Sequence, residues 1–173
     1  GSGGLNLAKA ESPGPNPDRL TPLFKDTAVI LWGVYLVFTL AQTLLLFFSG
    51  LDMFSALNHS FTTLSTGGFS TFDTSVSSFS NSTKLILCLF MFIAGTSFTL
   101  HYKSRRNLKE YLYSSEFKFF TFIVFFSASI FYIFLNTSGN GAINSITESL
   151  FTSLAIITTT GYSSSNFELW PGG

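Results

Sequence analysis

Three long runs of apolar residues, over residues 28–48, 85–100 and 117–135, constrain the fold of this chain more than any other feature. A helix that crosses the hydrocarbon core of a bilayer needs about 20 mostly apolar residues. The first and third runs reach that length, and the second does so if His101 and Tyr102 extend it into the interface. Only 10% of the residues are charged, against about 25% in soluble domains. We therefore predict an all-α membrane protein. The alternative, that each run is a helix buried inside a large soluble protein, does not suit a chain of 173 residues with three such runs.

The basic residues predict the orientation of these helices. Eight of the nine precede the first run or surround the link between the second and third: Lys9, Arg19, Lys25, Lys103, Arg105, Arg106, Lys109 and Lys118. The positive-inside rule makes that side cytoplasmic. The outer segments, 49–83 and 136–173, carry one lysine, Lys84 at the edge, and four acids: Asp52, Asp73, Glu148 and Glu168. Such acids either raise the local cation concentration or are ordinary solvated loop charges.

The two outer segments repeat one pattern. Each opens with a weakly apolar stretch, 53–64 or 142–157, that is too short to cross a bilayer and suits a re-entrant helix. Each then reaches a Thr-X-Gly-aromatic-Ser motif, at 66–70 and at 159–163, and Gly68 and Gly161 lie 93 residues apart (161 minus 68). The repeated unit is a span, a re-entrant helix, a glycine turn and a second span. An internal repeat of this kind is typical of pseudo-symmetric transporters.

The residue types of the two glycine turns, 65–69 and 158–162, suit a potassium filter. A selectivity filter replaces the hydration shell of an ion with backbone carbonyl oxygens, and glycine permits the backbone angles that point successive carbonyls to one side. Threonine hydroxyls can add oxygens at the inner end, and the aromatic residue of each turn can wedge the loop against its neighbours. The alternative is a flexible outer loop, in which Ser, Thr and Gly are ordinary residues. The predicted filter residues are Ser65, Thr66, Gly67, Gly68, Phe69, Thr158, Thr159, Thr160, Gly161 and Tyr162.

Two residues of the first re-entrant stretch, Asn58 and His59, are candidates for supporting the filter. His59 either sets filter geometry or senses protons, or it is a packed, hydrogen-bonded structural histidine, the alternative that we favour. The sequence offers no nucleophile–base pair, nucleotide-binding glycine loop or metal-ligand cluster, so we expect no enzyme, no covalent cofactor and no nucleic-acid partner.

Taken together, four motifs resemble the ion-translocating subunit of the Trk/Ktr/HKT potassium transporter family, nearest its bacterial TrkH type. They are GGLNLAKAESPGP at 3–15, STGGFSTFDTS at 65–75, the link at 104–117, and TTTGYSSSNFELWP at 158–171. The family's filter glycine maps onto Gly68 and Gly161. Ser70 and Ser163 stand where the tetrameric potassium-channel filter has a second glycine, which resembles the relaxed filter of the transporters.

The resemblance implies four membrane–pore–membrane repeats around one pore, with a K⁺ channel-like fold. Four parts are expected here: a cytoplasmic segment at 1–25, a complete repeat at 26–103, a cytoplasmic link at 104–116, and the first half of another repeat at 117–173. The chain would then be a fragment, and residues 1–4 are either native or a cloning remnant.

The function implied by the resemblance is potassium uptake across the bacterial inner membrane, with K⁺ as the substrate. The implied partners are membrane lipid, the remaining repeats, a second copy in a homodimer, and a cytoplasmic nucleotide-binding regulatory subunit. Arg105, Arg106 and Lys109 would either face that subunit or act as topology determinants near lipid headgroups. Two other functions stay open: an alternating-access carrier for another small solute, and a membrane anchor that transports nothing.

Overall fold

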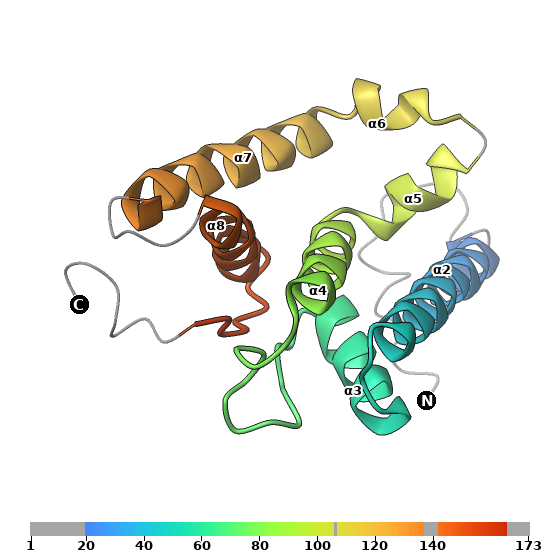
Figure 1. Cartoon of the computed structure of the whole chain (residues 1–173). Coiled ribbons are helices and arrows are strands. Elements are labelled where there is room, and N and C mark those ends of the chain that lie inside the picture. The colour runs from blue at the N-terminus through green and yellow to red at the C-terminus, as the bar shows by residue number, and fades with distance from the viewer. Residues whose placement is uncertain (1–19, 106, 137–141, 166–173) are drawn as a thin grey trace, which may run out of the picture.

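In the computed structural model, which describes residues 20–105, 107–136 and 142–165, every regular element is a helix (Figure 1). The helices, in chain order, are α2 (Leu20–Phe48), α3 (Met53–Leu64), α4 (Asn81–Ala94), α5 (Phe98–Ser104), α6 (Lys109–Tyr113), α7 (Ser115–Asn136) and α8 (Ala142–Ile157). Residues 1–19, Arg106 and Glu168 lie outside this description. The predicted all-α fold is confirmed for the part described.

Two of the helices are long and apolar enough to cross a membrane. They cover Thr27–Phe48 and Ser115–Asn136, which confirms the first and third predicted spans. Their exposed surface is largely apolar, as at Trp32, Phe48 and Ile133, while their buried positions include Thr39 and Gln42. This arrangement reverses that of soluble proteins and is typical of helices that meet lipid on the outside and keep small or polar residues on the side facing their neighbours.

The second predicted span is wrong as a single helix. The chain breaks between α4 and α5, whose axes differ by 93°. The break falls at Gly95 and Ser97, residue types with weak helix propensity. His101 compensates for the break, because its Nε2 lies 2.9 Å from the Ile93 carbonyl oxygen near the end of α4. The pair therefore counts as one bent span or as a re-entrant loop.

The two short helices of the repeated pattern, α3 and α8, begin and end at the residues that the sequence predicts. Asp52 caps the start of α3, since its carboxylate accepts a hydrogen bond from the Ser55 backbone N–H at 3.0 Å. This bond is the main reason that the pKa of Asp52 lies below its usual value of 3.8, so the carboxylate is charged at neutral pH. Gly50, with φ of 106°, ends α2 and turns the chain into α3.

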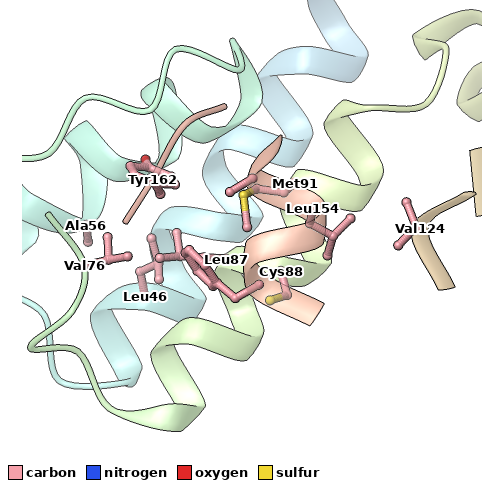
Figure 2. Packing of buried hydrophobic residues seen from close by; sticks show 11 residues of the cluster. Leu46, Ala56, Val76, Leu87, Cys88, Met91, Val124, Leu154 and Tyr162 are labelled. Atoms are coloured by element: carbon pink, nitrogen blue, oxygen red, sulfur yellow. The ribbon is translucent and has the colours of Figure 1, made fainter. Parts of the chain in front are cut away.

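The helices pack around the junction of the two repeated units. In Figure 1, α4 lies between α2 and α8, and α8 lies beside α7. Figure 2 shows the buried core that results, in which Leu87 and Met91 of α4 and Leu154 of α8 belong to one cluster. Tyr162, from the second glycine turn, lies in the same cluster near α3. The core therefore holds the second glycine turn against the first repeated unit.

Candidate functional site

The two glycine turns have the same backbone conformation. Thr66 and Gly68 have φ of 53° and 64°, and the residues 93 positions later, Thr159 and Gly161, have φ of 58° and 78°. The residue between each pair has no positive φ. Such alternation between left-handed and right-handed angles can point successive carbonyl groups to one side of the chain. A β-branched residue rarely adopts a positive φ, so both threonines are held in a strained conformation by their surroundings.

The same backbone hydrogen bonds connect each turn to its re-entrant helix. Each turn folds back onto the last helical turn before it, through three N–H groups that each have a counterpart 93 residues away. The matched bonds are Ser65 N–H to Phe61 O (3.0 Å) and Thr158 N–H to Leu154 O (2.9 Å), Thr66 to Thr63 (3.0 Å) and Thr159 to Ile156 (3.0 Å), and Gly68 to Thr62 (3.1 Å) and Gly161 to Ala155 (3.0 Å). The sequence repeat is thus also a repeat in three dimensions.

The two turns touch each other. A Cβ atom built on Gly68 would lie 1.7 Å from the carbonyl oxygen of Thr160, a distance at which no side chain fits. A Cβ built on Gly161 would meet nothing within 4 Å. Gly68 is therefore required both by its positive φ and by close contact, whereas Gly161 is required only by its φ.

Tyr162 connects the second turn to the helix of the first unit. Its hydroxyl oxygen lies 2.7 Å from the Thr62 hydroxyl and 3.1 Å from the Thr63 hydroxyl, both on α3. Its ring stacks on His59 with centroids 6.0 Å apart, and the residue is 2% exposed. Phe69 holds the equivalent position in the first turn and is 76% exposed. The contacts of Tyr162 thus fit the predicted wedge role. Within the described part of the chain, Phe69 has no equivalent packing site (seat) on a re-entrant helix.

The two residues proposed to support the filter differ in position. His59 is fully buried, its Nδ1–H donates to the Ser55 carbonyl oxygen at 2.7 Å, and its Nε2 lies 3.0 Å from the Ser70 hydroxyl just after the first turn. These are the contacts of a packed structural histidine. Asn58 instead donates to the Phe54 carbonyl oxygen of its own helix at 2.7 Å, so its side chain does not reach the turn.

Sequence reasoning missed a buried ion pair beside the second turn. Lys84 and Glu148 were expected as a loop lysine and as a solvated or cation-attracting loop acid. The structure instead places them on α4 and α8, with Lys84 Nζ 2.7 Å from a Glu148 carboxylate oxygen. No local signal pairs them, because the two residues are 64 positions apart.

The geometry can serve a cation in two ways. Each re-entrant helix ends directly before its turn, and the carboxyl end of a helix carries a partial negative charge. Main-chain oxygens of such turns are the groups that can replace water around a monovalent cation. Apolar spanning helices with short re-entrant helices that lead into contacting glycine turns define a membrane protein of the membrane–pore–membrane class.

Comparison with known proteins agrees with this class. Residues 1–171 match the family described as "TrkH: Cation transport protein". The chain belongs to the TrkH family of cation transport proteins. It is 35% identical to "Trk system potassium uptake protein TrkH" of Escherichia coli K12 over 177 residues, which cover 99% of this chain and 37% of that protein.

A second sequence relative and a solved structure show the same similarity. The protein called "Trk system potassium uptake protein TrkG" of Escherichia coli K12 is 30% identical over 180 residues, 99% of this chain and 36% of that protein. The solved structure "Crystal Structure of the Potassium Transporter TrkH from Vibrio parahaemolyticus" matches with a TM-score of 0.84 at 32% identity, over 96% of this chain and 37% of that chain. The chain thus spans little more than a third of the length of the relatives that it matches.

Proposed function

We propose that the chain is part of a potassium uptake protein and contributes two of the filter segments that line its pore. The observation that carries this proposal is the contact between two turns of matching backbone conformation, with the Thr160 carbonyl oxygen against Gly68. The filter atoms are proposed to be main-chain oxygens of residues 65–69 and 158–162. Relatives of this chain are named as potassium uptake proteins, which supports K⁺ as the substrate.

The proposal extends to the division of the chain and its setting. Residues 26–103 form one complete repeat, 104–116 the cytoplasmic link, which includes α6, and 117–173 the first half of the next repeat. The complete protein would lie in the bacterial inner membrane as a homodimer with a cytoplasmic nucleotide-binding regulatory subunit. Such a protein conducts passively through its pore and requires no catalytic residue.

Substitution of the two glycines in the complete protein tests the filter. We expect Gly68→Ser and Gly161→Ser to lower the preference for K⁺ over Na⁺, since serine is strained at a positive φ. A loss of about tenfold corresponds to about 1.4 kcal/mol of differential ion binding. Rubidium uptake in a transport-deficient cell and reversal potentials of the reconstituted protein measure it.

A matched control is Gly33→Ser on α2, where a Cβ meets nothing within 4 Å and the turns are not touched. Uptake and selectivity that stay unchanged in both filter variants would refute the filter role. An alternating-access carrier would show no single-channel current that reverses at the potassium potential. A membrane anchor would leave cysteines placed at Thr66 and Thr160 open to bulky external reagents.

A further inference from the structure

A buried lysine holds the chain that leaves the second glycine turn. Lys84 Nζ donates to a Glu148 carboxylate oxygen at 2.7 Å and to the Ser164 carbonyl oxygen at 3.0 Å. The Ser164 hydroxyl donates to the other carboxylate oxygen of Glu148. The side chains of Lys84 and Glu148 are only 7% and 19% exposed. Three separate segments, α4, α8 and the residues just after the turn, therefore meet in one network.

Charges in such a place are costly to bury. A lysine ammonium and a carboxylate both lose hydration, and their mutual attraction repays that loss only when further hydrogen bonds satisfy them. Here the Ser164 backbone and hydroxyl supply those bonds. Within a membrane protein, ionisable groups that are kept despite this cost generally mark functional sites.

The first repeated unit provides an internal comparison. Ser55 and Thr71 stand 93 residues before Glu148 and Ser164, and their hydroxyl groups lie 3.2 Å apart. A link between the re-entrant helix and the chain after its turn thus exists in both units. In the first unit the link is a neutral hydroxyl pair, whereas in the second it is a carboxylate joined by a lysine from the neighbouring helix α4.

The position of the network determines what it can control. Ser164 is the third residue after Gly161, and the intervening Ser163 is already bonded to the first unit through Ser75 Oγ and the Val76 N–H, both at 3.2 Å. The outgoing chain is thus held on one side by residues 75–76 and on the other by Lys84. The start of the turn is bonded to α8 through the Thr158 and Thr159 N–H groups. With the turn thus held at both ends, we expect the spacing of its carbonyl oxygens to resist relaxation around a smaller ion.

We propose that Lys84, through Glu148 and Ser164, is a positioning residue that sets the preference of the second turn for K⁺ over Na⁺. The inference rests on the proposed filter function. This positioning role of Lys84 differs from that of a purely structural ion pair, which would support folding and expression but leave the ion preference of the folded protein unchanged.

Charge removal in the complete protein tests the proposal. We expect Lys84→Met and Glu148→Gln each to lower the K⁺/Na⁺ permeability ratio by about three- to tenfold, the size that coupling within one network gives. The double variant should lose less than the sum of the two, since each single change already breaks the pair. Reversal potentials of protein that reaches the membrane measure the ratio, and Lys118→Met, at an exposed lysine on α7, should leave it unchanged.

A milder change keeps the proposal testable if the Lys84→Met protein does not fold. Ser164→Ala removes one hydroxyl and leaves the ion pair in place, and it should shift the ratio in the same direction by a smaller factor. Lys84→Arg retains the charge and should stay near the wild-type ratio. An unchanged ratio in folded Lys84→Met, or in Ser164→Ala when the former does not fold, overturns the inference.

The test of Lys84 can fail while the proposed filter function holds, and the two results can be told apart. If Gly68→Ser and Gly161→Ser lower selectivity while Lys84→Met does not, the filter stands and the positioning role fails. If the glycine variants keep wild-type selectivity, the proposed filter itself fails. A potassium current with wild-type selectivity in the Lys84→Met protein therefore counts against Lys84 alone.

Discussion

At the scale of single residues, the glycine turns depend on side chains that lie outside them. Two threonines with positive φ cannot hold that conformation by themselves. The Thr62 hydroxyl donates to the Phe69 carbonyl oxygen at 2.9 Å, at the end of the first turn. Tyr162 at the end of the second turn reaches the same hydroxyl. One threonine of α3 thus contacts both turns.

The hydroxyl of Tyr162 can be removed to measure this connection. We expect Tyr162→Phe to lower the free energy of unfolding by about 0.5–1.5 kcal/mol, the usual net value of a lost hydrogen bond. The remaining ring still fills the seat beside His59. Thermal unfolding of the detergent-solubilised complete protein measures the change.

Tyr102→Phe on α5 is the control, because Tyr102 is 43% exposed and such changes stay within about 0.5 kcal/mol. Equal melting temperatures for the two variants would show that the Tyr162 hydroxyl contributes nothing to joining the turns.

At the scale of elements, the bend between α4 and α5 brings a helix end against the second turn. A Cβ built on Gly95 would lie 2.6 Å from Phe120 Cζ on α7 and 2.8 Å from Thr158 Cγ2. Gly95 has an ordinary negative φ of −70°, so its small size matters rather than its flexibility. The absence of a side chain lets α4, α7 and the second turn approach one another closely.

We therefore expect Gly95→Ala to destabilise the protein by about 1–3 kcal/mol, the usual cost of overpacking. The Phe120 ring can move, whereas Thr158 begins the second turn, so the strain should also alter ion selectivity. Melting temperature and reversal potential measure the two effects.

Gly33→Ala on α2 is the matched control, since a Cβ there meets nothing within 4 Å. Alanine in a helix interior is more favourable than glycine by about 1 kcal/mol, so this variant should be slightly more stable. If Gly95→Ala is as stable as Gly33→Ala, the close approach is not needed.

At the scale of the whole molecule, the contact between the two repeated units is one-directional: the aromatic residue of the second turn packs against the first unit, and its equivalent in the first turn does not pack against the second. The second unit places Tyr162 against α3 of the first, while the first unit leaves Phe69 exposed. Under the four-repeat architecture that we propose, the matched φ values of the two turns place an equivalent seat for Phe69 on the re-entrant helix of another repeat. Since the chain spans 37% of its TrkH relative, we place that seat in the rest of the complete protein.

Cysteine labelling can locate Phe69 in the complete protein. We expect Phe69→Cys to react slowly with a bulky external maleimide, because the neighbouring repeat that we propose would cover it. Asp73→Cys, at an exposed position in the same outer loop, should react fast. Equal reaction rates at the two positions would contradict a covered seat for Phe69.

The sequence by itself determined the helical membrane class, the two re-entrant helices and the likeness of the two turns. Those properties are local: apolar run length decides a membrane span, and the spacing of Asp52, Met53–Leu64 and the glycine motif decides where a short helix starts and stops. Periodicity did not reveal the break at Gly95, because an apolar run reads the same whether the helix is straight or bent by 93°.

Only the tertiary structure decided which distant groups meet. The contact of Gly68 with the Thr160 carbonyl, the seat of Tyr162 and the Lys84–Glu148 pair all join residues at least 64 positions apart. Hydrogen bonds and ion pairs act only over a few ångströms, so they depend on how the helices pack, and nothing in the neighbouring sequence encodes the partner. For that reason the sequence determined where the two turns lie, whereas packing alone decided how they are held together.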